Sequence, residues 1–381
     1  MRGGRVPSVA IVGTRGYPSY YGGFETAVRH LAPYLVEAGW DVTVYGRSGA
    51  TRPDDVDRDP RVGTRETRGM DTKAISTLSY GLTACVDVAR RKPDVALVMN
   101  VANGFWLPLL RARRVPTLVN VDGIEWNRAK WGRFAKAVFH LGAKLTARNG
   151  TRLVYDSREI ARLWKLEFGL DGEFIPYGGV AVDKELPVEE GLQSGQYVLV
   201  VARFVPENSI PEFIQAATSL GADHDVVIVG SSGYGGELDA AVRQLTETLP
   251  RVRWLGHISD DQRLYALWQH AGAYFHGHSV GGTNPALVQA MACGAPVVAR
   301  DTPYNQEVLG DEGLFVAADS VRIEQTIRRV LTDSALRDDL RATSIGRAAG
   351  DYSWDSVCAK YESALRALAE RQRPGLQGKR K

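Results

Sequence analysis

The sequence predicts an α/β protein with two domains, each built around a parallel β-sheet. Short apolar runs rich in valine, isoleucine and leucine alternate along the chain with stretches of helical periodicity. The runs are continuous rather than alternating, which is typical of parallel strands covered by helices on both faces. A polar stretch over residues 183–196 divides the series, and 381 residues are enough for two separate cores.

Twelve strands are expected, six on each side of the polar stretch. In the first half they cover Val9–Val12, Asp41–Gly46, Asp94–Val101, Pro116–Gly123, Arg152–Ser157 and Phe174–Gly179. In the second half they cover Tyr197–Phe204, Asp225–Ser232, Val252–His257, Ala273–His278, Pro296–Asp301 and Gly313–Val316.

The domain boundaries follow from this series. We expect an N-terminal Rossmann-like domain over 1–182, a linker over 183–196 and a C-terminal Rossmann-like domain over 197–352. A last helix over 353–370 follows the complete second sheet and is predicted to pack back across both domains. The basic tail over 371–381 (RQRPGLQGKRK) is expected to be disordered.

The composition is that of a soluble protein, with 44% hydrophobic and 24% charged residues. A net charge of +3 is too small to indicate nucleic acid as a partner. Cys85, Cys293 and Cys358 lie far apart and form no C-x-x-C pair, so reduced thiols are expected. A membrane-spanning helix needs about 18 consecutive apolar residues, and no stretch approaches that length. No export signal follows Met1, so we predict a cytoplasmic protein.

The first glycine-rich loop, Gly13–Glu25 (GTRGYPSYYGGFE), follows the strand Val9–Val12 and precedes an amphipathic helix over Phe24–Ala38. A strand, a glycine-rich loop and a helix form the first unit of a nucleotide-binding sheet. The loop lacks the G-x-G-x-x-G spacing, and the chain has no G-x-x-x-x-G-K-[ST] loop. Neither an NAD site nor a P-loop is therefore predicted.

The second glycine-rich loop lies within His278–Gly294 (HSVGGTNPALVQAMACG), after the strand Ala273–His278. Asn284 is expected to cap a helix that begins at Pro285. The N–H groups and the positive dipole end of such a helix attract a phosphate. An ordinary strand–helix joint has the same pattern, but the presence of two such loops favours a phosphate site.

Four long segments, in this order, resemble one family of enzymes. They are Gly13–Thr26 (GTRGYPSYYGGFET), Val121–Trp131 (VDGIEWNRAKW), Val201–Asn208 (VARFVPEN) and Phe275–Ala292 (FHGHSVGGTNPALVQAMA). By these segments the chain resembles the family 4 glycosyltransferases of the GT-B fold, and within them the bacterial polysaccharide rhamnosyltransferase-like group. The resemblance implies an α/β GT-B fold, in which two Rossmann-like domains with parallel sheets face a central cleft.

The resemblance also implies a reaction. This is a retaining transfer, without metal or other cofactor, of a sugar from a nucleotide-sugar donor to a saccharide acceptor. The donor it favours is dTDP-L-rhamnose, with UDP- and GDP-hexoses as alternatives. The acceptor it favours is a polyprenyl-diphosphate-linked saccharide in cell-surface polysaccharide synthesis, with a soluble acceptor as the alternative. A sugar-nucleotide-binding protein without turnover is the alternative from another class.

On the donor side, negative charge gathers on the diphosphate leaving group, so cations and amides aimed at it lower the barrier. Arg203 ends a strand, and its guanidinium can bind two phosphate oxygens; a surface arginine is the alternative. Arg203 and His278 are taken as catalytic. The remaining predicted donor contacts are Gly22, Gly23, Gly281, Gly282, Thr283, Asn284, Gln289 and Glu307. For Glu307, an exposed carboxylate near a helix start is the alternative.

Three positions matter because many family members carry charged residues there. Asn208 stands where a lysine is common, so the charge clamp lacks one cation. Gly281 and Gln289 stand where many members carry a glutamate pair, although Gly281 is usual in the rhamnosyltransferase-like group. We expect the Gln289 amide to accept a ribose hydrogen bond without the assistance of charge.

On the acceptor side, Glu25, Asp122 and Glu125 are expected to line the site. Asp122 follows the apolar run TLVNV and can meet the acceptor hydroxyl as a base or orienting group; a helix cap is the alternative. His276 and His278 are two residues apart on one strand, so both face the same side. Contact with the donor sugar and a structural role remain open for both histidines.

Two further segments have compositions that could bind other ligands. The acidic run Asp54–Asp59 follows no strand and is interpreted as a solvated charge run, so no metal site is predicted. The segment Glu125–Arg148 mixes aromatic and basic residues. Its apolar stripe consists of Trp131, Phe134, Val138, Leu141 and Leu145. Its basic face is expected either to be solvated or to rest on anionic lipid at the inner face of the plasma membrane.

Overall fold

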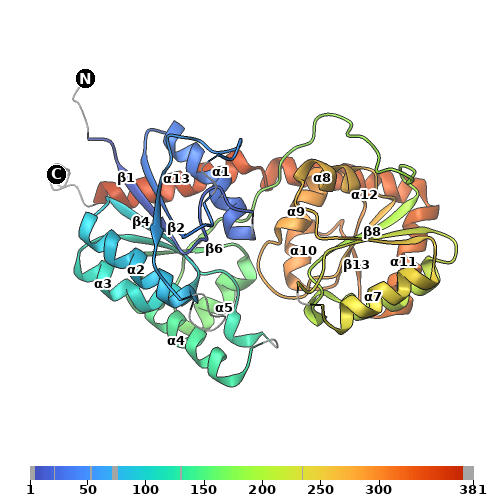
Figure 1. The fold of residues 1–381 in the computed structure, drawn as a ribbon, viewed down its shortest axis with the longest axis horizontal. Helices are drawn as coiled ribbons and strands as arrows, with labels where there is room; N and C mark the ends of the chain where they lie inside the picture. Colours follow the sequence, from blue (N-terminus) through green and yellow to red (C-terminus); the bar gives the residue numbers. More distant parts are fainter. Residues whose placement is uncertain are drawn as a thin grey trace. The chain divides into compact units, whose positions relative to one another are not determined.

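The structure is a computed structural model that describes residues 5–20, 22–51, 54–70, 76–128, 131–233 and 235–371. Contacts divide the chain into two compact units, Met1–Pro176 with Asp355–Lys381, and Tyr177–Trp354. We call them the first and the second unit. In each, helices cover both faces of a parallel sheet (Figure 1), as the sequence predicted.

The first unit contains a seven-stranded sheet in the order β3-β2-β1-β4-β5-β6-β7. The strands are β1 Ser8–Val12, β2 Asp41–Arg47, β3 Gly63–Thr67, β4 Val95–Met99, β5 Thr117–Asn120, β6 Arg152–Tyr155 and β7 Glu173–Phe174. The strand expected over Phe174–Gly179 is confined to Glu173–Phe174, and β3 was not predicted from the sequence. Its sequence, GTRET, has no apolar run because this edge strand pairs only with β2 and buries only Thr67.

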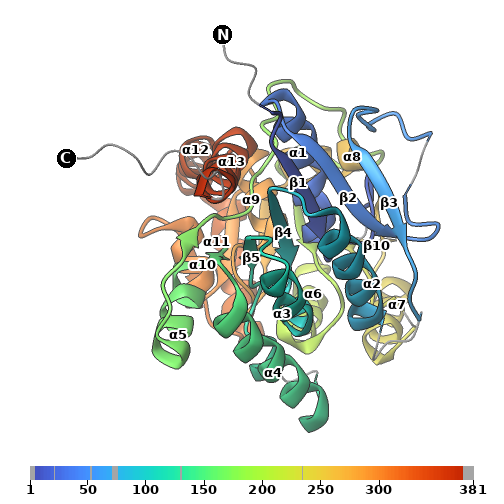
Figure 2. The same ribbon diagram turned by 90° about the vertical axis from the view of Figure 1, so that its left-hand side faces the viewer.

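Two helical layers enclose this sheet (Figure 2). One contains α2 Ser76–Arg91, α3 Leu107–Ala112, α4 Arg133–Asn149 and the 3-10 helix η1 Val101–Trp106, which contact one another. The other contains α1 Gly23–Glu37. The crossover from β1 to β2 contains α1, and the crossover from β3 to β4 contains α2. These two crossovers run in opposite directions along the sheet, and because both are right-handed their helices lie on opposite faces. The 3-10 helix η2 Glu125–Asn127 precedes α4, and α5 Arg158–Phe168 follows β6.

The last helix, α13 Trp354–Arg371, packs on the first unit although it follows the second along the chain. The hydroxyl of Tyr361 accepts a hydrogen bond from Asn120 Nδ2 over 2.7 Å. Glu362 accepts one from the Trp40 indole nitrogen over 3.1 Å. These contacts belong to the first unit alone. Except for Arg371, the predicted basic tail lies outside the described residues.

The second unit contains a six-stranded sheet in the order β10-β9-β8-β11-β12-β13. The strands, all expected, are β8 Tyr197–Val201, β9 Asp225–Val229, β10 Val252–Gly256, β11 Ala273–His276, β12 Val297–Arg300 and β13 Leu314–Val316. The helices are α6 Ile210–Leu220, α7 Glu237–Thr248, α8 Asp261–Gln269, α9 Pro285–Ala292, α10 Pro303–Leu309, α11 Ser320–Thr332 and α12 Ser334–Asp351, with the 3-10 helix η3 Pro206–Asn208. Successive strand residues enter opposite cores, with Leu199 among the α8 and α9 side chains and Val200 among those of α6 and α11.

The segment 183–196, predicted as a linker, packs on the second unit. Leu186 and Leu192 are buried, and the Leu186 N–H donates to Gln269 Oε1 over 2.8 Å. Glu189 pairs with Arg263 of α8. The segment is polar because it covers an outer helix, yet its two leucines and its ion pair fix it there. The first and last residues of the second unit lie side by side. The Gly179 N–H, near its start, donates a hydrogen bond to Tyr352 O, near its end, over 2.8 Å.

Candidate functional site

In the first unit, polar residues follow the central strands at their carboxyl ends, where open parallel sheets bind ligands. Asn100 follows β4 and Asp122 lies just beyond β5, the neighbouring strand. Asn100 Nδ2 donates to Asp122 Oδ2 over 3.0 Å. Both residues have a positive φ, 71° and 61°. Asp122 was predicted from the sequence, whereas Asn100 was missed because asparagine after a strand is common in ordinary turns.

The first glycine-rich loop is held in place by Glu25, one of the three residues predicted to contact the acceptor. Glu25 is 6% exposed, and its Oε1 accepts a hydrogen bond from the Arg15 N–H over 3.0 Å. Gly13 has a φ of +95°, and a Cβ there would lie 2.3 Å from Met99 O, so only glycine fits. Gly22 caps α1 in extended conformation and Gly23 begins the helix. Glu25 therefore shapes the loop backbone.

The acidic run Asp54–Asp59, interpreted from the sequence as a solvated charge run, contacts the first glycine-rich loop. Tyr20 of the glycine-rich loop places its hydroxyl 3.0 Å from carboxylate oxygens of both Asp55 and Asp57. Burial and the two carboxylates raise the pKa of Tyr20 to about 12. Within the described ranges, no cluster of His, Cys, Asp or Glu is arranged to hold a metal ion. The run instead ties a neighbouring loop to the glycine-rich loop.

Glu125 is 5% exposed, and its carboxylate is engaged by its own loop. Arg128 approaches Glu125 Oε1 to 2.8 Å, and the Trp131 indole nitrogen donates to Oε2 over 2.7 Å. A carboxylate buried between a cation and an indole N–H stabilises the loop between β5 and α4. An acceptor that bound Glu125 directly would have to displace one of these partners.

In the second unit, the central strands β8, β11 and β12 are neighbours. Arg203 lies just beyond β8 and is exposed. Asn208, at the position where a lysine is common, is 4% exposed and donates from Nδ2 to the Arg203 carbonyl over 3.0 Å. Asn208 therefore supports the backbone that carries Arg203 and supplies no charge.

Arg300 is a second cation at this edge that was not predicted from the sequence. It ends β12 and is half-buried, and its Nη1 donates to Ser209 Oγ over 2.9 Å. Ser209 Oγ in turn donates to Gly277 O over 2.9 Å. Among the described residues, neither Arg203 nor Arg300 forms an ion pair. An arginine closing the apolar run PVVAR was the signal available in the sequence.

The two histidines of β11 and its following loop lie together, as their spacing predicted. Their rings stack with centroids 4.4 Å apart and planes 14° apart. His276 is fully buried and its Nδ1 lies 3.0 Å from the Tyr274 hydroxyl. Burial, and then the neighbouring His278, hold the pKa of His276 well below its usual range. His276 is therefore a neutral core residue, while His278 is half-buried at the strand end.

The second glycine-rich loop enters α9 as expected. Gly281 has a φ of 109°, and Gly282 and the buried Thr283 complete the turn. Asn284 caps the helix, since its Oδ1 accepts a hydrogen bond from the Ala286 N–H over 3.0 Å. The cap prediction is confirmed.

The Gln289 side chain is hydrogen-bonded within the protein. It is 9% exposed, and its amide pairs with the backbone of Val180. Val180 N–H donates to Gln289 Oε1 and Gln289 Nε2 donates to Val180 O, each over 2.9 Å. The predicted contact with a ribose hydroxyl would have to displace this pairing.

Helix α10 joins the loops that follow β11 and β12. Asn305 is 3% exposed and its Nδ2 donates to His278 O and Arg300 O over 2.9 and 2.8 Å. Glu307 is half-buried, and its carbonyl accepts a hydrogen bond from Arg347 Nη2 over 3.2 Å. Asn305 was not predicted from the sequence, and it fixes the backbone at the start of the second glycine-rich loop and at the end of β12.

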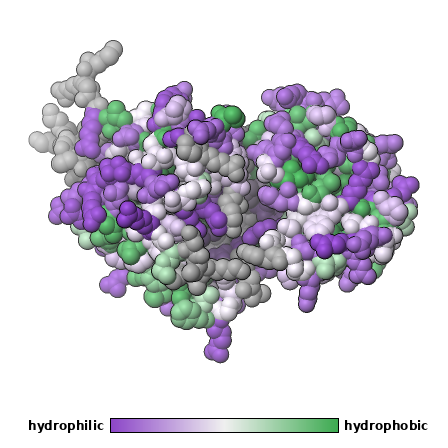
Figure 3. All heavy atoms as spheres, in the orientation of Figure 1, coloured by the Kyte–Doolittle hydropathy of each residue, from purple (hydrophilic) through white to green (hydrophobic). Residues whose placement is uncertain are grey.

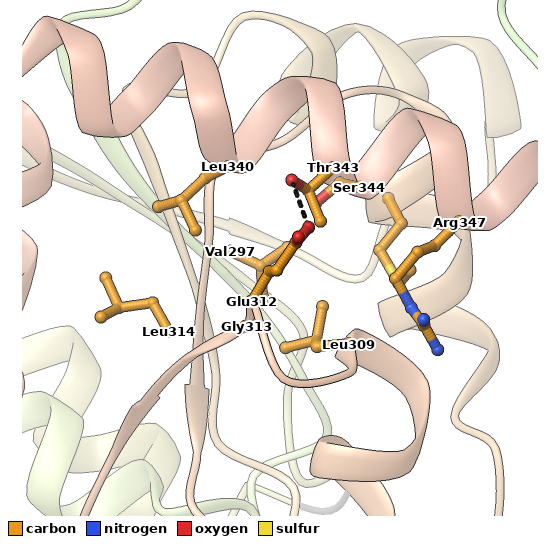
Figure 4. A pocket seen from close by; sticks show the side chains of 10 residues that line it. Val297, Leu309, Glu312, Gly313, Leu314, Leu340, Thr343, Ser344 and Arg347 are labelled. Atoms are coloured by element: carbon orange, nitrogen blue, oxygen red, sulfur yellow. Dashed lines mark hydrogen bonds between the residues drawn. The ribbon is translucent and has the colours of Figure 1, made fainter.

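A small cavity in the second unit lies away from these loops (Figure 4). It is lined by Met291, Val297, Leu309, Glu312, Gly313, Leu314, Leu340, Thr343, Ser344 and Arg347. Its free volume of about 10 Å³ is the room of one water molecule. Glu312 accepts a hydrogen bond from the Thr343 hydroxyl over 3.3 Å across it. The cavity is a packing gap beneath α12.

Helix α4 buries a different face from the one predicted. Its buried residues are the small Gly142, Ala143 and Thr146. They pack on η1, where a Cβ on Gly104 would lie 2.2 Å from Gly142 O. Phe134 and Leu141 of the predicted apolar stripe are 84% and 49% exposed, and apolar side chains gather over α4 at the lower edge of Figure 3. In the part of the chain described, no helix has the length and apolarity to span a bilayer.

Comparison with protein families agrees with the division into two units. Residues 22–178 match the family described as "Glycosyl transferase 4-like domain". Residues 183–347 match the family described as "Glycosyl transferases group 1". The chain therefore carries both glycosyltransferase domains.

Curated relatives point to mannosyltransferases. The O-antigen chain mannosyltransferase B of Escherichia coli is 27% identical over 45% of this chain and 46% of its own length. The phosphatidyl-myo-inositol mannosyltransferase of Mycolicibacterium smegmatis is 31% identical over 53% of this chain and 54% of its own length. The matches thus span about half the length of these relatives. They do not support the rhamnosyltransferase-like subgroup.

Solved structures share the fold. Sucrose-phosphate synthase from Thermosynechococcus elongatus has a TM-score of 0.77 and 19% identity, covering 97% of this chain and 100% of that one. HepE of Anabaena in complex with UDP and glucose has a TM-score of 0.74 and 15% identity, covering 95% and 100%. Together with the family matches, they show that the fold is GT-B.

Proposed function

We propose that the protein is a glycosyltransferase that moves a sugar from a nucleotide-sugar donor to a saccharide acceptor. The observation that carries the proposal is the carboxyl edge of the second sheet. The three central strands lie in the order β8-β11-β12. Arg203 follows β8, the glycine turn that enters α9 follows β11, and Arg300 ends β12, so the turn lies between the two arginines in strand order. Two arginines that form no ion pair with any described residue, together with a helix N-terminus, suit a diphosphate whose charge grows as the glycosidic bond breaks.

The donor is proposed to be dTDP-L-rhamnose or a nucleotide-activated mannose. Motifs shared with the rhamnosyltransferase-like group support the first. The mannosyltransferase names of the relatives support the second. A UDP-hexose is the third candidate, supported by the UDP complex of HepE.

Retention of anomeric configuration and independence of metal are also proposed. Retention rests on the family 4 resemblance. Metal independence rests on Arg203 and Arg300, because two guanidinium groups supply the positive charge that a divalent cation supplies elsewhere.

The acceptor is proposed to be lipid-linked, presented at an anionic membrane surface on the cytoplasmic side. The exposed Phe134 and Leu141 of α4 and the exposed cations Arg133, Lys144 and Arg148 on the same helix support this. The wild type should co-sediment with vesicles that contain phosphatidylglycerol. The double variant Phe134→Ser/Leu141→Ser should co-sediment to a smaller extent. A matched control, Leu166→Ser, removes a 71% exposed leucine of α5. Equal sedimentation of all three would remove this part of the proposal.

The activity is tested by a donor panel. Full-length protein is incubated with dTDP-L-rhamnose, GDP-mannose or UDP-glucose and with lipid-linked saccharides extracted from bacterial membranes. Release of the nucleoside diphosphate, with the sugar recovered on the lipid fraction, is expected for one donor. If no donor raises the melting temperature and none is consumed, the proposal is wrong.

A sugar-nucleotide-binding protein without turnover is the second candidate. It is supported by Asn208 and Gln289, whose side chains are hydrogen-bonded to the backbone at two positions where many family members carry charged residues. A donor that raises the melting temperature without being consumed would favour this candidate.

A further inference from the structure

The carboxyl edge of the first sheet holds a hydrogen-bonded pair with unfavourable backbone conformations. Asn100 has a φ of 71° and a ψ of 136°, and Asp122 has a φ of 61°. The Asn100 values lie outside the left-handed helical region, in a part of conformational space that glycine occupies far more readily. On backbone grounds alone, glycine is the favoured residue at position 100. The asparagine side chain must therefore contribute something that glycine lacks.

The Asn100 side chain makes two contacts that need to be told apart. Its Oδ1 accepts a hydrogen bond from the Ala102 N–H over 2.8 Å and so caps η1. Its Nδ2 donates to Asp122 Oδ2 over 3.0 Å. The cap requires only an acceptor, which aspartate supplies equally well. The donor to Asp122 is the feature specific to asparagine.

Asp122 is also held from its backbone. Its N–H donates to Asn120 Oδ1 over 2.9 Å, and Asn120 Nδ2 donates to the Tyr361 hydroxyl over 2.7 Å. Asn120 is 2% exposed. The main chain of Asp122 is thus fixed through Asn120 to α13, and one carboxylate oxygen is fixed by Asn100. Because both the backbone and one carboxylate oxygen of Asp122 are hydrogen-bonded, the side chain has less rotational freedom than that of an exposed aspartate.

We propose that Asn100 is a positioning residue, which orients the Asp122 carboxylate toward the acceptor hydroxyl. The inference rests on the proposed function. The amide N–H stabilises the ionised carboxylate and fixes its rotation, so that the carboxylate accepts the hydroxyl hydrogen bond. An amide itself takes up no proton, so Asn100 orients Asp122 without competing for the proton of the acceptor. The backbone conformation is retained because it aims the Asn100 side chain across the strand ends.

The test exchanges the two side chains. Asn100→Asp and Asp122→Asn are made singly and together, and kcat, KM for the donor and melting temperature are measured with the donor that turns over in the panel. Each single variant is expected to lose at least tenfold in kcat with little change in the donor KM. The double variant restores an amide–carboxylate hydrogen bond. Its melting temperature should return toward that of the wild type. Its kcat should stay as low as that of Asp122→Asn, because the carboxylate then follows β4 and no longer β5.

Two further variants separate strain from function. Asn100→Gly is expected to keep its melting temperature, because glycine accepts the backbone conformation, while losing at least tenfold in kcat. Arg114→Gly is the matched control, since Arg114 has a φ of 59° and lies after α3, away from the pair. It should keep full kcat.

The outcomes distinguish this inference from the proposed function. A wild type that consumes no donor overturns the proposed function and this inference with it. A wild type that turns over while Asn100→Asp and Asn100→Gly keep kcat within twofold overturns the inference alone. Recovery of kcat in the exchanged double variant would show that the pair is structural, and would also overturn it.

Discussion

The carboxyl edges of the two sheets differ in chemistry although the sheets share one architecture. The edge of the first sheet presents amides and a carboxylate, with Asn100 and Asp122 in positive-φ conformations. The edge of the second presents Arg203, Arg300 and a glycine turn, with the half-buried His278 stacked on the buried His276. Carboxylates and amides suit hydroxyl groups, whereas guanidinium groups and helix N-termini suit phosphates. The difference teaches that two sheets of the same architecture can carry opposite charge at their edges, which is the basis for proposing a donor site in the second unit and an acceptor site in the first.

The two edges also differ in how their polar groups are fixed. In the first unit, side chains bond to each other across neighbouring strands. In the second, Asn208, Asn305 and Gln289 bond to backbone carbonyls and so hold the loops. Under the proposed function, substitutions at the first edge should therefore change catalysis either at Asp122 itself or through the orientation of its carboxylate. Those at the second divide into residues that bind the ligand and residues that support its loops.

The largest effect is expected at Arg203. Under the proposed function, Arg203→Ala removes a cation that binds the leaving diphosphate, and this should raise the barrier by about 2–4 kcal/mol and reduce kcat/KM roughly 30- to 1,000-fold. Its melting temperature should not change, because Arg203 is exposed and forms no ion pair within the described residues. Arg251→Ala, another exposed arginine of the second unit, is the control. Near-normal turnover of Arg203→Ala would place the diphosphate elsewhere.

The next effect concerns Gln289, where sequence and structure give different expectations. From the sequence, Gln289→Glu should tighten nucleotide binding. In the structure, the new carboxylate would face the Val180 carbonyl and lose a buried hydrogen bond, which costs about 1–3 kcal/mol of stability. We expect a lower melting temperature, with the exposed Gln262→Glu as the control. An unchanged melting temperature with tighter binding, measured by calorimetry with the free nucleoside diphosphate, would restore the first expectation.

A smaller effect is expected from pH. The pKa of His276 is lowered in the folded protein, so below about pH 6.5 the unfolded chain binds a proton that the folded chain does not. Stability should therefore fall as the pH falls from about 7 to 5, and His276→Phe should flatten this dependence. The exposed His257→Gln should leave it unchanged. Melting temperatures across the pH series give the answer, and identical slopes for wild type and His276→Phe would contradict it.

The smallest effect is expected from chelation of metal. If Arg203 and Arg300 supply the charge at the second edge, excess EDTA should leave turnover within about twofold. The measurement is nucleoside diphosphate release before and after EDTA, followed by magnesium or manganese. Loss of turnover that a metal restores would require a cation site and would return attention to Asp54–Asp59.

Part of this protein was predictable from local sequence. Apolar runs and helical periodicity predicted eleven of the strands and the order of the two units, because burial on both faces of a parallel sheet leaves a continuous apolar signal, whereas the strand expected over Phe174–Gly179 is only Glu173–Phe174. The signal failed for β3, an edge strand, and for α4, whose small residues face inward while Phe134 and Leu141 face outward. Edge strands and small-residue contacts depend little on apolar area, so hydrophobic patterning cannot detect them.

The sequence by itself determined which residues end the strands, and so placed Arg203, Asp122 and the glycine turn of α9 at the sheet edges. Only the tertiary structure decided their partners. Gln289 pairs with Val180, which is 109 positions away along the chain, and Asn100 pairs with Asp122, 22 positions away. Such pairs are set by strand order and by the exact path of each loop. A hydrogen bond requires two groups to meet within about 3 Å, and local sequence carries no information about that distance between separate strands.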